Sequence, residues 1–170
     1  MTHTIYLVRH GIAADAEPGE RDADRALTAE GTHKLEQIGA GLKVLGAAPA
    51  VILASPLRRT RETADVLQAV LEAPLGVQLC TPLAPGHAAR EVVAELRPYS
   101  NRGELMLVGH QPDMGELASH LLTGSPHHVP LPFRKGSVAA IVVGTLSANA
   151  RGELLWFLTP KQLRAIGAGA

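Results

Sequence analysis

Short apolar runs alternate with helical patterns along this chain, and that alternation limits the possible folds more than any other feature. Three runs of β-branched and other apolar residues predict buried strands, namely Thr4–Val8, Ala50–Ala54 and Glu104–Val108. The proline-rich stretch Pro74–Pro85 has room only for a short strand around Val77–Leu79. Strands that alternate with helices predict an α/β protein with a mostly parallel sheet.

The segments between these strands show helical periodicity. The apolar face of the first helix consists of Leu35, Ile38, Leu42 and Leu45. Thr28 is its expected cap. Further helices are expected after Ser55-Pro56, over Ala88–Leu96 and from Asp113 to about Leu122. Asp113 and Glu116 resemble a capping box, in which Asp113 is the cap.

The C-terminal part predicts a different arrangement. Ser137–Thr145 and Glu153–Leu158 are expected to form a β-hairpin through the turn-rich stretch Ala148–Gly152. Gln162–Ile166 predicts a short closing helix. Two stretches without apolar periodicity, Ile12–Ala26 and Thr123–Pro132, predict long surface loops. No repeat or linker divides the chain, so we expect one domain over residues 1–170.

The composition excludes several classes of protein. Apolar residues make up 46% of the 170 residues and charged residues 19%, which is enough for a buried core. Sixteen basic residues balance sixteen acidic ones, so the basic excess that is typical of nucleic-acid binding is missing. Cys80 is the only cysteine, which excludes an internal disulfide framework and a four-cysteine metal site. No apolar run approaches the ~20 residues that span a bilayer, and the N-terminus lacks a signal-peptide pattern, so we expect a cytoplasmic protein without membrane association.

Reactive side chains follow three of the predicted strands. Arg9-His10-Gly11 follows the first strand, Ser55–Thr60 the second, and Gly109–Pro112 the strand at Glu104–Val108. Parallel strands end at the same edge of a sheet, and open α/β sheets bind their ligands beyond that edge. The sequence therefore predicts one pocket that contains two histidines and two or three arginines.

Such a pocket suits a phosphoryl group. Arginines repel each other unless an anion lies between them, and their planar guanidinium groups match phosphate oxygens. Histidine is both a nucleophile and a group that changes charge near neutral pH. We therefore expect His10 to attack phosphorus, Gly11 to leave the approach open, and His110 to donate to a non-bridging oxygen. This chemistry requires no metal and no cofactor.

The same residues resemble the motifs of the histidine phosphatase superfamily, which includes phosphoglycerate mutases and acid phosphatases. Its Arg-His-Gly signature matches Arg9–Gly11, its Ser-Pro-x-x-Arg-x-x-x-Thr block matches Ser55–Thr63, and its Gly/Ser-His-x-Pro block matches Gly109–Pro112. Weaker matches at Arg25–Gly31 and Leu158–Leu163 are similar to the SixA-type phosphohistidine phosphatases. Three blocks in order, each at a strand end, make the resemblance specific.

The resemblance implies a fold and a set of residue roles. The implied fold is a compact, phosphoglycerate mutase-like, three-layer α/β fold, in which helices flank a mixed, mostly parallel sheet that ends in a C-terminal β-hairpin. His10 would be the nucleophile and form a transient phosphohistidine, while Arg9, Arg59 and His110 would hold the phosphoryl group. The further candidates for substrate binding are Arg25, Ser55, which either donates a hydrogen bond or caps the helix, and Gly11.

The general acid of the larger enzymes has no counterpart at its usual place. Phosphoglycerate mutases carry a glutamate after the second helix, whereas the stretch Cys80–His87 contains no carboxylate. Missing acid help slows hydrolysis of an alkyl phosphate by about 10²–10⁴. Phosphohistidine leaves as an imidazole and needs less help, so we expect phosphohistidine on a protein as the substrate. The candidates for a substitute acid are Asp15, Glu17, Glu20, Asp22, Asp24 and His87.

Two other functions stay open at this stage. With a substitute acid, the protein would be a broad phosphomonoesterase for small phosphorylated substrates. Without catalysis it would be a phospho-binding module, although keeping both His10 and His110 argues against that. The expected partner is a phosphorylated protein of the histidine-phosphocarrier type, and a monomer is favoured. His127 and His128 show no metal-site spacing, and their role stays open.

Overall fold

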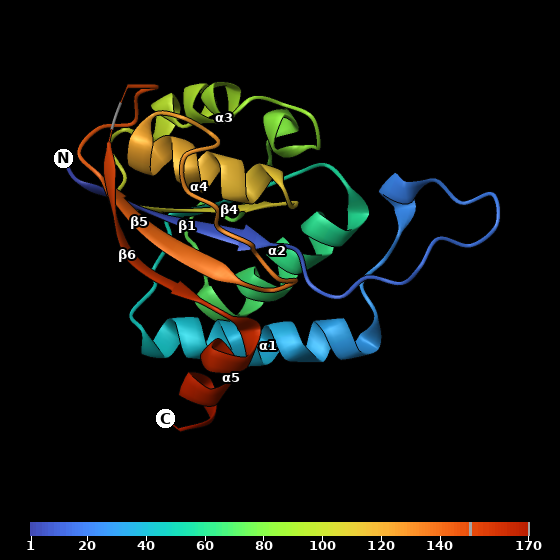
Figure 1. The fold of residues 1–170 in the computed structure, drawn as a ribbon. Helices are drawn as coiled ribbons and strands as arrows, with labels where there is room; N and C mark the ends of the chain where they lie inside the picture. The colour runs from blue at the N-terminus through green and yellow to red at the C-terminus, as the bar shows by residue number, and fades with distance from the viewer. Residues whose placement is uncertain (150, 170) are drawn as a thin grey trace.

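The computed structural model describes residues 1–149 and 151–169, which form one six-stranded sheet with helices on both sides (Figure 1). The strands are β1 (His3–Arg9), β2 (Val51–Ala54), β3 (Val77–Leu79), β4 (Glu104–Gly109), β5 (Val138–Val143) and β6 (Gly152–Leu158). Their order across the sheet is β3-β2-β4-β1-β5-β6. β1, β4, β2 and β3 pair in parallel, whereas β5 is antiparallel to β1 and β6 is antiparallel to β5. The predicted α/β class, with a mostly parallel sheet and a C-terminal hairpin, is confirmed.

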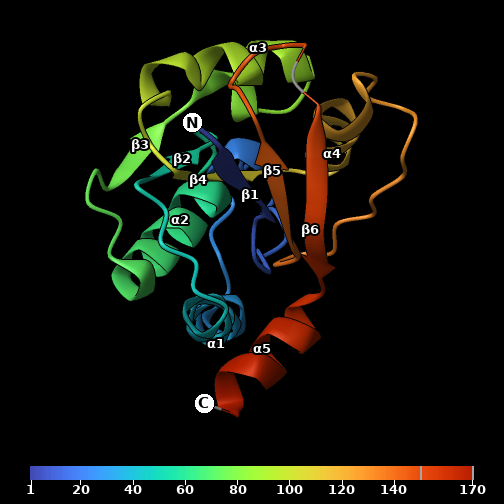
Figure 2. The ribbon, with the colours of Figure 1, turned by 90° about the vertical axis from the view of Figure 1, so that its left-hand side faces the viewer.

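Helices make up the two outer layers. They are α1 (Ala29–Val44), α2 (Arg58–Leu71), α3 (Ala89–Glu95), α4 (Asp113–Thr123) and α5 (Pro160–Ala168), with 3₁₀ turns η1 (Asp22–Asp24), η2 (Thr81–Leu83) and η3 (Arg97–Tyr99). Figure 2 shows α1, α2 and α5 on one face of the sheet and α3 and α4 on the other. This is the expected three-layer arrangement.

Each strand contributes side chains to both helical layers because successive residues of a strand point to opposite faces. In β1, Ile5 and Leu7 belong to the core beneath α3 and α4, whereas Tyr6 and Val8 belong to the core beneath α1, α2 and α5. A strand buried on both faces needs a continuous apolar run, and this is why the run at the start of the chain predicted a buried strand.

Several predicted elements appear with small differences in their ends. β3 has the predicted bounds, β1 is one residue longer at each end than predicted, and α5 extends beyond Gln162–Ile166 in both directions. Thr28 caps α1 as predicted, because its Oγ1 accepts from the Gly31 N–H at 2.9 Å. The prediction for Leu45 was wrong: α1 ends at Val44, and the Leu45 side chain is exposed. In the predicted connection Ala148–Gly152, residue 150 lies outside the described residues.

The predicted capping box of α4 was also wrong. Pro112 occupies the cap position with helical backbone angles, so Asp113 is the first helical residue and its side chain makes no capping bond. A backbone carbonyl takes the place of the capping side chain in the first turn, since the carbonyl of His110 accepts from the Met114 N–H at 2.8 Å. Asp113 Oδ1 accepts from the Gly86 N–H at 3.4 Å.

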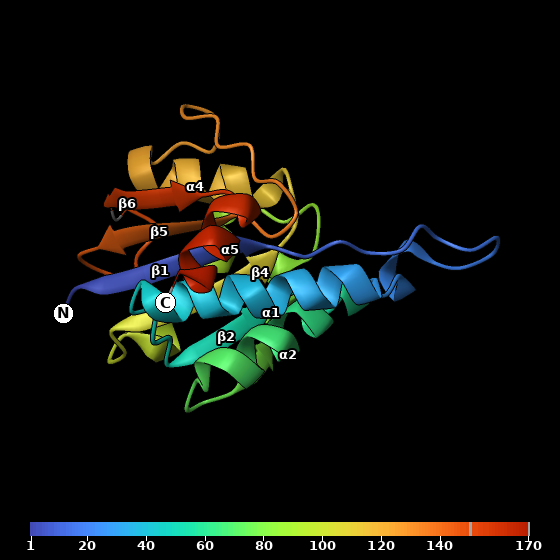
Figure 3. The same ribbon diagram turned by 90° about the horizontal axis from the view of Figure 1, so that it is seen from below.

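The parallel strands bring the sequence motifs to one edge of the sheet. Arg9 at the end of β1 pairs with Gly109 at the end of β4, and the Ser55 N–H that follows β2 donates to the Val108 carbonyl at 3.0 Å. The predicted surface loop after β1 extends outward beyond this edge before it returns to α1 (Figure 3). Within the described residues, no helix has the length and apolar character that crossing a membrane requires.

Candidate active site

His10 follows β1 directly and is held in one ring orientation. Its Nδ1 lies 2.8 Å from the Gly11 carbonyl oxygen, which only accepts hydrogen bonds. Nδ1 therefore carries the proton, and Nε2 presents a lone pair. That lone pair accepts from Arg59 Nε at 3.3 Å. The ring is buried, with 6% of the residue exposed, and its basic nitrogen is directed into a cationic cluster.

Arg59 is the central cation of this cluster. It lies in the first turn of α2 and is as buried as His10. Its Nη2 is 3.5 Å from His110 Nδ1 and donates to Asp22 Oδ2 at 3.0 Å. Its Nη1 donates to the Asp22 carbonyl at 2.8 Å. The guanidinium thus faces both histidines and binds an anionic group, which in this structure is the Asp22 carboxylate.

The preceding arginine has a different environment. Arg58 Nε donates to Glu62 Oε1 at 2.7 Å on the solvent side of α2. Because α2 begins at Arg58, the helical rotation between neighbours places Arg59 inward and Arg58 outward. The structure therefore brings Arg59, and not Arg58, to the two histidines.

His110 faces His10 across the cluster. The two ring centroids are 5.4 Å apart, and the rings are inclined by 58°. His110 Nε2 lies 2.8 Å from Ser55 Oγ, so this hydroxyl holds the ring with Nδ1 toward Arg59. Ser55 Oγ also accepts from the Leu57 N–H at 3.4 Å. Ser55 therefore contacts His110 and supports the segment that enters α2. It does not cap the helix, because the N-cap of α2 is Leu57.

Arg9 lies at the border of the cluster. Its Nη1 donates to the Phe133 carbonyl at 2.7 Å, and its Nε is buried without a hydrogen-bond acceptor. A buried N–H without an acceptor is costly, so this group favours an incoming anion. The backbone around Arg9 is tied to a turn, because the Gly136 N–H donates to the carbonyls of both Arg9 and His10 at 3.1 Å.

Arg25 lies one contact away from the cluster. Its Nε donates to the Ala14 carbonyl at 2.7 Å, and its Nη1 donates to Asp22 Oδ1 at 3.0 Å. The Leu27 N–H donates to Glu62 Oε2 at 2.7 Å, which ties the same loop to α2. In this state Arg25 orients Asp22 toward Arg59 and does not contact either histidine.

Gly11 lies against α1. A Cβ at this position would lie 2.6 Å from Leu35 Cδ1, so a larger residue would require the Leu35 side chain to shift. The Gly11 N–H donates to Thr63 Oγ1 at 3.1 Å, and the Thr63 hydroxyl donates to the Arg59 carbonyl at 2.6 Å. Thr63 therefore links the His10 segment to α2. Sequence reasoning gave it no role, although its fixed place in the second motif was a signal.

Burial keeps both histidines neutral near physiological pH. Desolvation, with smaller contributions from nearby cations, lowers the pKa of His10 to about 4. Desolvation, the neighbouring His10 and Arg59 lower the pKa of His110 to about 3. Desolvation and the charge of Arg59 also lower the pKa of Arg9. A neutral His10 has the free lone pair that nucleophilic attack requires.

One of the candidate acids reaches the cluster. Asp22 contacts Arg59, and the hydrogen bond from Arg25, reinforced by that from Arg59, lowers its pKa. It is therefore ionised near neutral pH. Asp24 pairs with Arg21 at the surface, and His87 Nδ1 lies 3.1 Å from Glu91 Oε2. Among the described residues, no hydrogen bond or ion pair joins the other loop carboxylates, Asp15, Glu17 and Glu20, to His10, Arg59 or His110.

His127 and His128, in the Thr123–Pro132 loop, make hydrogen bonds through their backbone N–H groups. The His127 N–H donates to Ser125 Oγ at 3.5 Å and the His128 N–H donates to Ser119 Oγ at 3.1 Å. In the part of the chain that the structure describes, no three His, Cys, Asp or Glu side chains are grouped to hold a metal ion.

The arrangement is chemically suited to phosphoryl transfer. A neutral imidazole offers Nε2 at a point where a buried guanidinium and a second histidine converge. Phosphoryl transfer needs a nucleophile in line and donors around the equatorial oxygens. His10 has the chemistry that the first requires, and the side chains of Arg59, His110 and Arg9 have the chemistry that the second requires.

Comparisons with known proteins agree with this chemistry. The model of the histidine phosphatase superfamily (branch 1) matches residues 5–80. An uncharacterised protein of Picosynechococcus sp. is 35% identical over 163 residues, which are 94% of this chain and 98% of that protein. The structure of the protein histidine phosphatase SixA complexed with tungstate superposes with a TM-score of 0.81 at 26% identity, covering 94% of this chain and 99% of that one.

A more distant structure has the same fold. The phosphoglycerate mutase of Bacillus anthracis superposes with a TM-score of 0.68 at 16% identity, covering 98% of this chain and 97% of the mutase. The fold is therefore phosphoglycerate mutase-like, as the resemblance implied. The family motifs lie at the strand ends that build the cluster, and the structural similarity extends over nearly the whole chain. We conclude that the chain belongs to the histidine phosphatase superfamily, with SixA-type phosphatases among its structural neighbours.

Proposed function

We propose that this protein is a metal-independent, cytoplasmic phosphatase that hydrolyses phosphohistidine on a protein through a covalent phospho-His10 intermediate. The observation that carries the proposal is the fixed tautomer of His10. Its Nδ1–H is bound by the Gly11 carbonyl, and its Nε2 lone pair faces Arg59. A module that only bound phosphate would need donors at this position and not a basic nitrogen.

In the first step, His10 Nε2 attacks the phosphorus of the substrate phosphohistidine. The new N–P bond forms while the N–P bond to the substrate imidazole breaks. The electron pair of the broken bond stays on the departing nitrogen, so a substrate ring that is protonated at its other nitrogen leaves as neutral imidazole. Arg59 donates to the equatorial oxygens after Asp22 has left it. Arg9 and His110 donate to the same oxygens and stabilise the charge that spreads over them.

In the second step, water attacks the phosphorus of phospho-His10. The P–Nε2 bond breaks, inorganic phosphate leaves, and His10 returns to its neutral state. Ser55 is proposed to keep His110 oriented in both steps through the 2.8 Å contact with its Nε2. Gly11 holds the His10 tautomer, and Arg25 is proposed to contact the substrate once Asp22 releases it.

The leaving group supports the choice of substrate. Asp22, the one acid candidate that touches Arg59, has a lowered pKa and is ionised near neutral pH, so it is a poor proton donor for an alkoxide. A histidine side chain leaves as an imidazole, whose conjugate acid has a pKa of about 6.5, and requires less help. The similar SixA structure holds tungstate, a tetrahedral oxyanion like phosphate.

The test is phosphate release, with EDTA present, from a histidine-phosphorylated phosphocarrier protein and from a panel of alkyl and aryl phosphomonoesters. His10→Ala is the matched control. We expect preference for the phosphoprotein, an acid-labile phosphoenzyme after rapid quenching, and loss of both activity and phosphoenzyme in His10→Ala.

Each contrary result points to a different error. Faster turnover of an alkyl phosphate would assign the protein to the small-molecule phosphomonoesterases and make a loop carboxylate the proton donor. Undiminished activity in His10→Ala would exclude the covalent mechanism. Phosphate binding without turnover of any substrate would favour the phospho-binding module.

A further inference from the structure

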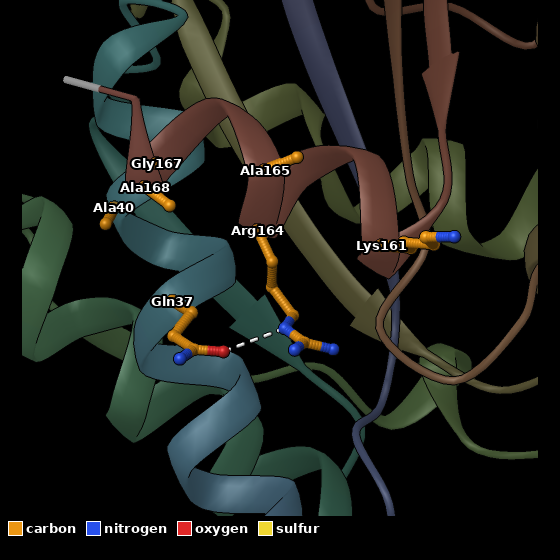
Figure 4. A pocket seen from close by; sticks show the side chains of 7 residues that line it. All are labelled: Gln37, Ala40, Lys161, Arg164, Ala165, Gly167 and Ala168. Atoms are coloured by element: carbon orange, nitrogen blue, oxygen red, sulfur yellow. Dashed lines mark hydrogen bonds between the residues drawn. The ribbon is translucent and has the colours of Figure 1, made fainter.

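Two adjoining cavities lie beside the segment that contains His10 and Gly11. They are enclosed by α1, α5 and the turn that follows Phe133. The smaller, of about 130 Å³, reaches from Gly11 to α5. The larger, of about 410 Å³, lies between α1 and α5. Lys161 and Arg164 line both cavities, and Figure 4 shows both on α5, with Arg164 reaching toward Gln37 of α1. The floor of the smaller cavity is apolar, because it includes the buried side chains of Leu35 and Ile38.

The rim of the smaller cavity is cationic. Its charged residues are Lys34, Lys135, Lys161 and Arg164, which we call the basic rim. Lys34 is paired with Glu30. Lys135 and Lys161 are exposed and have no ion-pair partner among residues 1–149 and 151–169. Lys135 and Lys161 therefore keep a positive charge that no ion pair within the described residues offsets, whereas the Glu30 carboxylate pairs with Lys34 and lies within electrostatic range of Arg164.

Arg164 is oriented without losing its charge. Its Nε donates to Gln37 Oε1 at 2.7 Å, and a neutral amide fixes the guanidinium without neutralising it (Figure 4). No carboxylate within hydrogen-bond distance of its two terminal nitrogens is present in the described part of the chain. A guanidinium held in this way loses little conformational freedom when it binds a carboxylate.

The elements around the smaller cavity, which are α1, α5 and the turn that contains Lys135, are closely packed. A Cβ on Gly41 would lie 2.0 Å from the Leu163 carbonyl oxygen, so α1 and α5 touch backbone to backbone. Lys135 lies in the turn closed by the Ser137 N–H and the Arg134 carbonyl at 2.8 Å, and Gly136 in that turn has a φ of 83°. The Gly136 N–H donates to the His10 carbonyl, so this turn is tied to the nucleophile's own backbone. The charge of Lys135 is among those that lower the pKa of His10.

The basic rim differs from other cations of the chain that are paired. Arg58 is paired with Glu62 and Arg21 with Asp24, so these charges cancel locally. The chain as a whole has no net charge, with sixteen residues of each sign. The rim gathers Lys135, Lys161 and Arg164 around one cavity, whose lining also includes Gly11, the residue next to His10.

We propose that the smaller cavity and its basic rim form a docking site for the protein substrate. The substrate inserts one apolar side chain between α1 and α5 and places carboxylates against the rim. This inference rests on the proposed function. A cavity of about 130 Å³ suits a single aliphatic side chain, and the cations around it match flanking carboxylates. Apolar anchors surrounded by charge-complementary residues are the usual form of a specific protein interface.

The test uses pairs of phosphohistidyl peptides that differ in one triplet, Glu-Leu-Glu or Lys-Leu-Lys, placed at a range of spacings on either side of the phosphohistidine. The readout is the ratio of kcat/KM for the acidic and the basic peptide, so a general loss of catalysis cancels. The variant is Lys135→Glu with Lys161→Glu in the full chain. Both side chains are exposed, and a glutamate at the start of α5 suits the helix dipole, so folding is expected to be kept. Arg90→Glu on α3, across the sheet, is the control with the same type of charge change.

We expect the unmodified protein to prefer the acidic peptide by about tenfold at low salt, the double variant to lose or invert that preference, and Arg90→Glu to keep it. Replacing the leucine of the triplet by alanine should also reduce kcat/KM. A ratio near one in the unmodified protein, or a ratio that the double variant leaves unchanged, would overturn the docking site while the phosphohistidine activity stands. Failure to hydrolyse any phosphohistidyl peptide, with turnover of p-nitrophenyl phosphate intact, would overturn the proposed function and the docking site with it.

Discussion

Replacing Asp22 by alanine should strengthen the binding of inorganic phosphate. In the structure, Asp22 Oδ2 accepts from Arg59 Nη2 at 3.0 Å, and Oδ1 accepts from Arg25 Nη1 at 3.0 Å. A phosphate bound to Arg59 needs the same N–H group, so it must displace this carboxylate. The carboxylate therefore competes with the ligand from within the chain.

The magnitude follows from the exposure of the two partners. The Asp22 side chain is 63% exposed, whereas that of Arg59 is 7% exposed. Ion pairs with one solvated partner are worth at most about 1 kcal/mol, and this corresponds to about fivefold in affinity. Repulsion between the carboxylate and the phosphate dianion acts in the same direction. We therefore expect the Kd for phosphate to fall about fivefold in Asp22→Ala.

Isothermal titration calorimetry of each protein with phosphate near neutral pH measures the Kd. Asp24→Ala is the matched control, because this carboxylate lies in the same 3₁₀ turn and pairs with the exposed Arg21. It should leave the Kd unchanged. Weaker phosphate binding by Asp22→Ala would refute the reasoning, since it would mean that the carboxylate prepares Arg59 for the ligand.

Two further predictions concern stability. The pKa values of about 4 for His10 and about 3 for His110 lie below the ~6.5 of an unfolded histidine, so the unfolded state binds more protons as the pH falls. The free energy of unfolding should therefore decrease from pH 7 to pH 5 by up to about 1.4 kcal/mol per pH unit for each histidine. Urea titrations at several pH values should show that the free energy of unfolding depends less steeply on pH in His110→Gln. An identical pH dependence would contradict the lowered pKa of His110. Gly41→Ala should cost about 1–3 kcal/mol in urea denaturation, because its Cβ would meet the Leu163 carbonyl, whereas Gly144→Ala, with open space around it, should cost little.

The fold was largely predictable because its signals are local. A strand buried on both faces needs an uninterrupted apolar run, and Thr4–Val8 and Glu104–Val108 have one. The cap at Thr28 was predictable for the same reason, since the hydroxyl and the Gly31 N–H that it accepts from are three residues apart. The errors at Leu45 and Asp113 are both at helix ends, where the backbone of neighbouring segments decides which residue is the last or the first.

Which side chains meet in the candidate active site was predictable from the topology. Once β1, β2 and β4 are parallel, their carboxyl ends coincide, so His10, His110 and Arg59 have to approach one another. The sequence could not tell which of the adjacent arginines contacts the histidines from spacing alone. The family motif favoured Arg59, and the rotation of α2 places it inward.

What the sequence by itself determined is the set of elements, their order and the three strand ends that carry the chemistry. Only the tertiary structure decided that Asp22 reaches Arg59, that Gly11 packs against Leu35, and that the basic rim surrounds a cavity lined by Gly11, next to His10. Periodicity and motifs record interactions between residues close in sequence or repeated in a family. Contacts between a loop, two helices and a turn far apart in the chain depend on the packed arrangement of whole elements, which no local pattern encodes.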